Sequence, residues 1–283
     1  MKATLRQGVV AALRGALRIS GDRFRYLLGE ALSANTKVLA LTDERVATPR
    51  GDITFHCLGE LALWRARTLL TKEPETLEWI DRFDDGDVYW DIGANVGVYA
   101  LYAAISRKLR VLAFEPSAAN YYLLNRNIEL NGLGGQMVAY CMALSDQGSI
   151  DTLNMQNTEL GGALSSFGTT VDESGRQFVP KFRQGSIGFS VDGFVEQFDP
   201  PFPNHIKIDV DGIEDRIIAG APKTLRDARL RSLSIELDDE RSDYSGAVIR
   251  AIERAGLKLV AKRQSEMIAH GGYKNIFNYQ FRK

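Results

Sequence analysis

The chain has few cysteines and histidines, the residues that form disulfides and zinc sites in small proteins. Its 283 residues include two cysteines, Cys57 and Cys141, and three histidines, which excludes a disulfide framework and a structural zinc site. The formal net charge of −1 supplies no field that would recruit nucleic acid or an acidic membrane, so we expect no nucleic-acid partner. The length suits one enzyme-sized domain, and we expect both cysteines to fill core positions on strands.

Long apolar runs are also missing. No stretch approaches the ~18 apolar residues of a membrane span, and Arg14 and Arg18 interrupt the run that a signal peptide needs. Residues 1–19 instead place arginines on one face of a helix, opposite an apolar face. We favour a helix packed on its own domain or on a partner subunit of a homo-oligomer, with weak membrane-surface association as the alternative. A cytoplasmic location is the prediction.

Apolar runs of strand length alternate with helical patterns, which predicts an α/β fold with a mostly parallel sheet covered on both faces. We expect residues 1–72 to form an N-terminal extension and residues 73–283 the main domain. Residues 149–190 form an insertion with a glycine- and serine-rich loop at 160–168, either a substrate loop or a surface excursion. The expected helices are 1–33, 61–70, 75–83, one after residue 97, 117–131, 213–220 and 241–255, and the expected strands are short ones within 34–60, then 88–92, 111–114, 136–142, 206–210, 232–237, 257–261 and 276–281.

The most informative stretch is V-Y-W-D-I-G-A-N-V-G-V at 88–98, read together with Glu115. An apolar strand runs into a turn that holds Gly93 and Gly97, and the next apolar run ends on Glu115. Glycines let the backbone approach a ligand, and a carboxylate at the tip of the next strand can accept hydrogen bonds from two ribose hydroxyls. Pro116 restricts Glu115 to extended geometry. The pattern predicts a nucleotide-binding βαβ unit.

The spacing of this unit argues against a dinucleotide. The glycines are spaced G-x-x-x-G, and Asn95 stands where a dinucleotide fold has the glycine that makes room for a pyrophosphate. Asp91, just before Gly93, would repel a pyrophosphate but suits a ligand with an ammonium group. S-adenosylmethionine has an amino group, a sulfonium and a ribose, and no phosphate. The residues therefore favour this cofactor, and an NAD-dependent oxidoreductase is the alternative.

Carboxylates follow several of the expected strands. Asp91 and Glu115 end the first two, Asp209 and Asp211 end the fourth, and Glu236 ends the fifth. Parallel strands present their carboxyl ends at one edge, where open α/β sheets bind ligands, so we expect these acids to converge on one site. Any one of them alone is equally well explained as a helix cap or a solvated turn residue.

The segment H-I-K-I-D-V-D-G-I-E at 205–214 gives a second strong signal. Strand alternation puts Lys207, Asp209 and Asp211 on one side. A lysine inside a covered parallel strand needs a charged partner, and Asp209 and Glu236 are the candidates. The group is either a structural ion pair or a polar patch that orients the substrate or takes its proton.

Three other features of the sequence do not point to the site at the strand ends. His205 lies about 13 Å down the strand from Asp209, at ~3.3 Å per residue, near the opposite edge of the sheet. The D-P-P-F sequence at 199–202 matches a motif of amino-group methyltransferases, but it precedes the fourth strand where that motif follows it, so we interpret it as a rigid loop. His56 and His270 remain outside candidates, because nothing in their spacing links them to the strand ends.

The ordered motifs resemble the FkbM family of S-adenosylmethionine-dependent methyltransferases. They are V-Y-W-D-I-G-A-N-V-G, F-E-P, A-L-S-D at 143–146, I-K-I-D-V-D-G-I-E and S-I-E-L, and the resemblance covers roughly residues 70–283. It implies a Rossmann-like class I methyltransferase fold. It also implies methylation of a hydroxyl on a saccharide, a glycan or a secondary metabolite.

The same resemblance implies roles for residues of the cofactor site. Asp91 and the glycines would line the methionine end, Glu115 the ribose, and Ala143 the adenine. Asp209 would lie at the reacting end, and Glu73 would cover the methionine moiety. With Asn95 from the turn, the expected cofactor-binding residues are Glu73, Asp91, Gly93, Asn95, Gly97, Glu115, Ala143 and Asp209.

Methyl transfer requires an oxygen aligned with the methyl group and the exclusion of water, and a sugar hydroxyl must also lose its proton. Our hypothesis is that Asp209 accepts this proton, with Lys207 and Glu236 as electrostatic neighbours. A divalent metal on Asp209, Asp211 and Glu236 is an alternative that these acids do not require. Asp211 stands where the family's D-V-E-G has a glutamate, so its role is open. A protein that binds the cofactor without turnover is a further alternative.

Overall fold

The computed structural model describes residues 43–264, 266–267 and 274–283. The chain divides into two compact units, residues 1–43 and 44–283. Residues 44–72 thus belong to the same unit as the rest, which begins earlier than the boundary expected at residue 73. The helix expected within 1–33, the membrane-surface alternative for residues 1–19 and His270 all lie outside the described residues. In the part of the chain that is described, no helix has the length and apolarity to cross a membrane.

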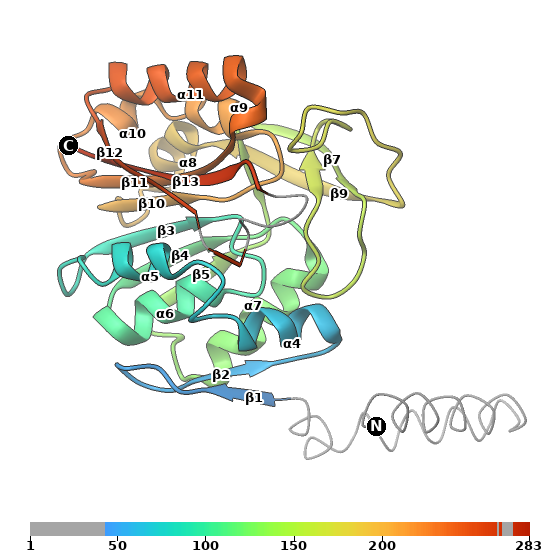
Figure 1. Cartoon of the computed structure of the whole chain (residues 1–283), viewed down its shortest axis with the longest axis vertical. Helices are drawn as coiled ribbons and strands as arrows, with labels where there is room; N and C mark the ends of the chain where they lie inside the picture. Colours follow the sequence, from blue (N-terminus) through green and yellow to red (C-terminus); the bar gives the residue numbers. More distant parts are fainter. Residues whose placement is uncertain (1–42, 265, 268–273) are drawn as a thin grey trace, which may run out of the picture. The chain divides into compact units, whose positions relative to one another are not determined.

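A seven-stranded sheet of order β12-β13-β11-β10-β3-β4-β5 forms the centre of the larger unit (Figure 1). The inner strands are parallel, and β13 and β12 add an antiparallel edge. The chain runs outward from β3 to β5 and then returns to the other side of β3, so the order switches between β3 and β10, where such sheets bind ligands. The strands are β3 (Val88–Ile92), β4 (Arg110–Phe114), β5 (Met137–Tyr140), β10 (His205–Ile208), β11 (Ser232–Asp238), β12 (Lys258–Arg263) and β13 (Ile276–Arg282).

Helices cover both faces of this sheet, as the alternation of patterns predicted (Figure 1). Figure 1 shows one group of helices below the sheet and a second group above it. The first group is α4 (Glu60–Arg67), α5 (Pro74–Ile80), α6 (Val98–Arg107) and α7 (Ala118–Leu130), and the second is α8 (Val191–Phe198), α9 (Glu214–Ala219), α10 (Pro222–Arg226) and α11 (Ser242–Arg254), with a 3-10 turn η2 (Asp239–Arg241) before α11.

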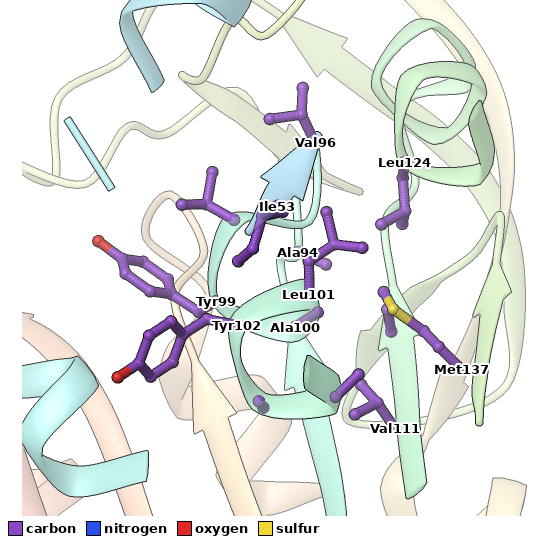
Figure 2. Packing of buried hydrophobic residues seen from close by; sticks show 14 of the residues in the cluster. Ile53, Ala94, Val96, Tyr99, Ala100, Leu101, Tyr102, Val111, Leu124 and Met137 are labelled. Carbon is purple, nitrogen blue, oxygen red and sulfur yellow. The ribbon is translucent and has the colours of Figure 1, made fainter. Parts of the chain in front are cut away.

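Strand alternation divides the core in two. Tyr89 packs into the cluster under the first group of helices, and its neighbour Trp90 packs into the cluster under the second. The first cluster includes Leu101 of α6 and Met137 of β5 together with Ile53, which comes from a strand of the N-terminal segment (Figure 2). This shared core explains why residues 44–72 are not a separate domain.

The expected insertion is a second, smaller sheet. It has the order β6-β9-β7-β8, lies beside the central sheet in Figure 1, and is antiparallel except for the pair β6–β9. The strand expected over 136–142 therefore ends early, because the chain leaves the central sheet after Tyr140 and joins the second one at Ala143. The strands are β6 (Ala143–Ser145), β7 (Ser149–Met155), β8 (Ser165–Phe167) and β9 (Phe182–Ser190), and a two-stranded sheet joins β1 (Asp43–Val46) to β2 (Ile53–His56).

Two further differences from the sequence predictions are local. Helices α8 and α10 were not expected, although Ser190 caps α8 by accepting a hydrogen bond from the N–H of Gly193 and Pro222 begins α10. Cys57 is buried as expected, whereas Cys141 is exposed in the link between β5 and β6. The expectation of two core cysteines was therefore wrong for Cys141.

Candidate active site

A cavity of about 340 Å³ opens at the carboxyl ends of the central strands. A small chamber of about 20 Å³ adjoins it and is lined in part by Asp91 and Asp209. The strand-end acids therefore do converge on one site, although Glu236 lies within β11 rather than at its end. Six residues singled out in the sequence line the larger cavity: Gly93, Asn95, Glu115, Asp209, Asp211 and Glu236.

Gly93 allows the turn after β3 to touch the end of β10. Its φ is 85°, and its N–H donates to the carbonyl of Phe114 at 2.9 Å. A Cβ at this position would overlap the backbone carbonyl of Asp209. Gly97 has another role, because it precedes α6 with φ 87° and its Cβ would lie 2.5 Å from Leu124 Cδ1. Gly97 lines neither cavity.

Glu115 is held in place by two backbone donors. Its Oε1 accepts from the N–H of Ser117 and its Oε2 from the N–H of Asn95, both at 2.8 Å. Burial raises the pKa of Glu115 to about 7, although these two hydrogen bonds lower it. Each carboxylate oxygen keeps a second lone pair, so the group can accept hydrogen bonds from two neighbouring hydroxyls.

Asp91 presents an unsatisfied oxygen. The residue is 1% exposed, and its Oδ2 has no hydrogen-bond partner among the described residues, although the nearby hydroxyl of Tyr89 lowers the pKa of Asp91. Burial raises the pKa of Asp91 to about 6, with Lys207, its neighbour across the β3–β10 pair, acting in the opposite direction. A buried acceptor without a donor is costly unless a ligand supplies one, so the small chamber suits a cationic donor.

Two lysines neutralise the acids next to Asp91. Lys207 is 1% exposed, donates to Asp209 Oδ2 and lies 4.9 Å from the centre of the Tyr99 ring. Lys72 donates to Glu73 Oε1 at 2.5 Å. Burial opposes both ammonium charges, but the surrounding carboxylates outweigh it and raise the pKa of each lysine. Burial likewise opposes the charge on Asp209, and Lys207 and Lys72 outweigh it and lower the pKa of that carboxyl.

Glu236 has no such cation of its own. No hydrogen bond or ion pair of its carboxyl is seen among the described residues. Burial, followed by the charges of Asp209 and Glu73, raises its pKa well above the usual range. One oxygen each of Glu73, Asp209 and Glu236 lie within 4.8 Å of one another, a spacing that also suits a divalent ion. Because the two lysines offset Glu73 and Asp209 and the raised pKa of Glu236 keeps that carboxyl neutral, we interpret the group as a charge-balanced cluster.

Comparison with known proteins agrees with this geometry. A model of the methyltransferase FkbM domain matches residues 91–259, more than half of the chain. The chain belongs to the FkbM methyltransferase family. Hexuronic acid methyltransferase AglP of Haloferax volcanii is 25% identical over 188 residues, which cover 65% of this chain and 70% of that protein. The family match confirms the expected methyltransferase activity and, with the sheet described above, the Rossmann-like class I fold.

Two solved structures are also similar. The METTL16 MTase domain aligns with a TM-score of 0.48 at 14% identity, over 92% of this chain and 91% of that chain. M. jannaschii TYW2, solved in complex with AdoMet, aligns with a TM-score of 0.41 at 11% identity, over 86% of this chain and 87% of that chain.

In this FkbM chain the glycine-rich loop forms a wall of the cavity. Asn120 accepts from the N–H of Gly161 and donates to the carbonyl of Gly162, both at 2.9 Å. Asn95 Nδ2 donates to the same Gly162 carbonyl at 2.8 Å, and Arg65 Nε donates to the carbonyl of Gly161 at 2.6 Å. The loop is thus fixed by side chains that also line the cavity.

Asp211 anchors the far end of this loop. Its Oδ2 accepts from the N–H of Ser165 at 2.8 Å, and its backbone carbonyl accepts from Ser166 Oγ at 2.7 Å. Burial is the main cause that raises the pKa of Asp211 to about 6. Asp211 lies outside the charge-balanced cluster, so the metal set considered from the sequence, which joined it to Asp209 and Glu236, is not the grouping that the structure forms.

Replacing Asn120 by alanine is expected to release the loop. The change leaves the buried Gly161 and Gly162 groups without their Asn120 partner, at a cost of about 1–3 kcal/mol in the free energy of unfolding. Hydrogen exchange over residues 156–168 should speed up. Asn157→Ala is the control, because Asn157 bonds only the N–H of Glu159 within the loop at 2.9 Å. Equal exchange in the two variants would contradict this view of the loop.

Several cavity residues were not predicted from the sequence. Trp64 and Arg65 come from α4, Lys72 from the turn after it, and Asn120 from α7. Glu173 comes from the loop between β8 and β9, and no partner for its buried Oε2 is found in the part of the chain that the structure describes. The lysine next to Glu73 was a signal available in the sequence, whereas nothing in the spacing marks the other four.

Two residues lie away from the cavity. Ala143 is buried in β6 opposite Gly188 and does not line the cavity, and its contact with the adenine stays a prediction. His205 bonds Ser232 Oγ at 2.7 Å and Asp87 Oδ2 at 3.0 Å. Burial lowers the pKa of His205 to about 4, and the residue belongs to the opposite edge of the sheet, as its distance from Asp209 indicated.

Proposed function

We propose that the protein is an S-adenosylmethionine-dependent O-methyltransferase that methylates a hydroxyl of a saccharide, a glycan or a secondary metabolite. The observation that carries the proposal is the Oδ2 of Asp91, which has no partner among the described residues, in a chamber that Arg65 and Lys72 also line. A methionine moiety carries one ammonium and one carboxylate, and this chamber offers a partner for each. The fixed carboxylate of Glu115 lies at the neighbouring strand tip, where a ribose would need it. The residues present therefore fit this cofactor.

The bound cofactor would supply a methyl group already activated on a sulfonium. The chain itself has to bind, orient and exclude water. Asp91 would accept from the ammonium, Arg65 and Lys72 would face the carboxylate, and Glu115 would fix the sugar ring. The loop at 160–168 would close the cavity over these groups, which leaves the side near Asp209, Glu236 and Glu173 for the acceptor.

A saccharide acceptor draws support from the relative that is named as a hexuronic acid methyltransferase. The acceptor side also offers carboxyl groups, which hydrogen-bond sugar hydroxyls well. Glu173 adds an unpartnered oxygen on that side.

Titration calorimetry with S-adenosylmethionine and with NAD tests the cofactor. We expect binding of the first and none of the second. Binding of NAD but not of S-adenosylmethionine would indicate an oxidoreductase instead. Labelled methyl transfer onto extracted glycans then tests the acceptor, and a protein that binds the cofactor but labels no extract would be a non-catalytic binder.

Glu115→Gln is expected to weaken S-adenosylmethionine binding by about 10- to 100-fold, because it removes charge-assisted bonds to the ribose and sets an amide N–H against a backbone donor. The pH dependence should change as well. The ligand-free pKa of Glu115 is about 7, so ionisation of this carboxyl should contribute a rise in wild-type affinity as pH increases through 7. The variant should lose this dependence.

Glu214→Gln is the matched control for this experiment. Burial also raises the pKa of Glu214 to about 7, but its carboxyl bonds the hydroxyl of Tyr244 at 2.6 Å, and it lines neither cavity. Calorimetry over pH 5.5 to 8.5 should find wild-type affinity for this variant. A parallel loss of affinity in both variants would show that Glu115 acts through the fold and not through the ligand.

A further inference from the structure

Asp209 and Glu236 are neighbours across two strands. The β10–β11 pairing aligns Ile206 with Leu233 and Ile208 with Ile235. One residue further the same offset brings Asp209 beside Glu236, and both line the cavity. An acceptor hydroxyl that enters there meets two carboxyl groups, and only one of them needs to take its proton.

Asp209 is badly suited to that task. Its Oδ2 accepts from the buried ammonium of Lys207, and Lys72 adds a second positive charge nearby. These lysines lower the pKa of Asp209, so the carboxylate holds its charge firmly and has little affinity for a proton. A general base works best when its pKa lies near the operating pH.

The charges around Glu236 have the opposite effect on its pKa. The charged groups that face it are Lys72, Glu73, Lys207 and Asp209. The two lysines and the two other acids balance one another, so a charge on Glu236 would be an unmatched negative charge. Its carboxyl therefore favours the neutral form, and its pKa lies well above the usual range. Arg65, which acts on Asp209, and Asp91, which acts on Lys207, add one charge of each sign and leave this balance unchanged. Two lysines sustain two carboxylates here, and the third needs a third cation.

We propose that the sulfonium of the bound cofactor is this third cation, and that its charge ionises Glu236 and makes Glu236, rather than Asp209, the proton acceptor of the reaction. The inference rests on the proposed function and deepens it. Gly93 and Asp209 line both the small chamber at Asp91 and the larger cavity, which Glu236 also lines, so a cofactor held by Asp91 and Glu115 would bring its positive charge into the cavity that Glu236 faces. The base would then be ionised only when the methyl donor is in place.

The step balances without a further reactant. The acceptor oxygen forms a bond to the methyl carbon, and the sulfur–carbon bond breaks with its electron pair going to sulfur. The acceptor's O–H bond breaks, and its proton moves to a carboxylate oxygen of Glu236. With the sulfonium now a neutral thioether, Glu236 is neutral as well, which returns the cluster to the state that its charges favour.

The test compares S-adenosylmethionine with S-adenosylhomocysteine, which has the same amino, carboxyl and ribose groups but a neutral sulfur. Calorimetry at pH 7 in buffers of different ionisation enthalpy counts the protons released on binding. We expect the sulfonium ligand to release roughly one proton more than the thioether. Protons lost at Asp91 and Glu115 are common to both ligands and cancel in the difference.

Glu236→Gln should abolish this difference in proton release, and Asp211→Asn should keep it. Asp211 is the matched control because it lines the same cavity and burial also raises its pKa, to about 6. A difference that survives in Glu236→Gln, or disappears in Asp211→Asn alone, would overturn the proposal.

Infrared spectroscopy of the wild-type protein supplies an independent measurement if Glu236→Gln fails to fold. The infrared difference spectrum between the two complexes should show a protonated carboxyl with the thioether and its loss with the sulfonium ligand. Equal proton release and no carboxyl band would overturn the inference while the proposed function stands, since both ligands would still have bound. Failure of both ligands to bind would instead remove the proposed function.

Once a glycan extract supports methyl transfer, Glu236→Gln should lower kcat by about 100-fold or more at nearly unchanged affinity for S-adenosylhomocysteine. A larger loss in Asp209→Asn at unchanged cofactor affinity would return the role of proton acceptor to Asp209.

Discussion

Replacing Lys207 by methionine is expected to lower the free energy of unfolding by about 3–5 kcal/mol, because it leaves buried carboxylates without their cation. Methionine fills a similar volume, so little of the loss comes from packing. Lys207 is 1% exposed and donates to Asp209 Oδ2, and its charge also acts on Glu73 and Asp91. Urea denaturation at pH 7 measures the effect.

Lys223→Met is the matched surface control. Lys223 pairs with Glu196, and their side chains are 74% and 57% exposed, so loss of this solvent-screened ion pair should change the stability far less than loss of Lys207. Adding Asp209→Asn to the Lys207 variant should recover part of the loss, because both partners of the pair are then uncharged. Equal destabilisation by the two lysine changes would contradict the role given to Lys207.

The Lys207 variant should also respond to pH with a definite sign. In the wild type the lowered pKa of Asp209 contributes stability that is present above its unfolded pKa and is lost as pH falls through the folded value. Without Lys207, burial raises the pKa of the remaining acids above their unfolded values, and the variant loses stability as pH rises. The gap between the two proteins should narrow from pH 7 to pH 4.

Gly93→Ala is expected to abolish detectable S-adenosylmethionine binding and to destabilise the fold by about 3 kcal/mol or more. The added methyl meets the backbone carbonyl of Asp209, which no side-chain rotation can move. The turn after β3 and the end of β10 must therefore separate, and both form walls of the cavity. Calorimetry and thermal melting measure the two effects.

Gly86→Ala separates this clash from backbone strain. Gly86 has the same φ of 85° as Gly93, but a Cβ there meets nothing within 4 Å. It should cost only the strain of a left-handed residue, about 1 kcal/mol, and keep full cofactor affinity. If both variants lose the same stability, the close approach of Gly93 to Asp209 is not what requires glycine.

Much of the central sheet could be predicted because its signals are local. The strand at 88–92 has the bounds given by its apolar run, and Ser117 caps α7 as its position indicated. The switch to the second sheet could not be predicted, because residues 136–142 carry one strand pattern that runs past the end of β5. Only the pairing of Ala143 with Gly188, far along the chain, separates β6 from β5.

Some residues of the candidate site could likewise be predicted from the sequence, and others could not. Asp91, Glu115 and Asp209 could be predicted as neighbours because parallel strands bring their carboxyl ends to one edge. Arg65 and Lys72 precede the first central strand, and no strand register points to them. The opposite pKa shifts of Asp209 and Glu236 could not be predicted either, because they depend on which carboxyl each lysine ammonium contacts in three dimensions.

The exposed thiol of Cys141 is a natural labelling site next to the cavity. Its Sγ lies 3.8 Å from the carbonyl of Pro116, a residue of the cavity wall, while Cys57, the other cysteine, is buried. Burial and then the charge of Glu115 raise the pKa of the Cys141 thiol, so its rate of alkylation follows the ionisation of Glu115. A thiol-reactive fluorophore on the unmodified sequence would therefore mark the rim of the cavity and signal its occupancy.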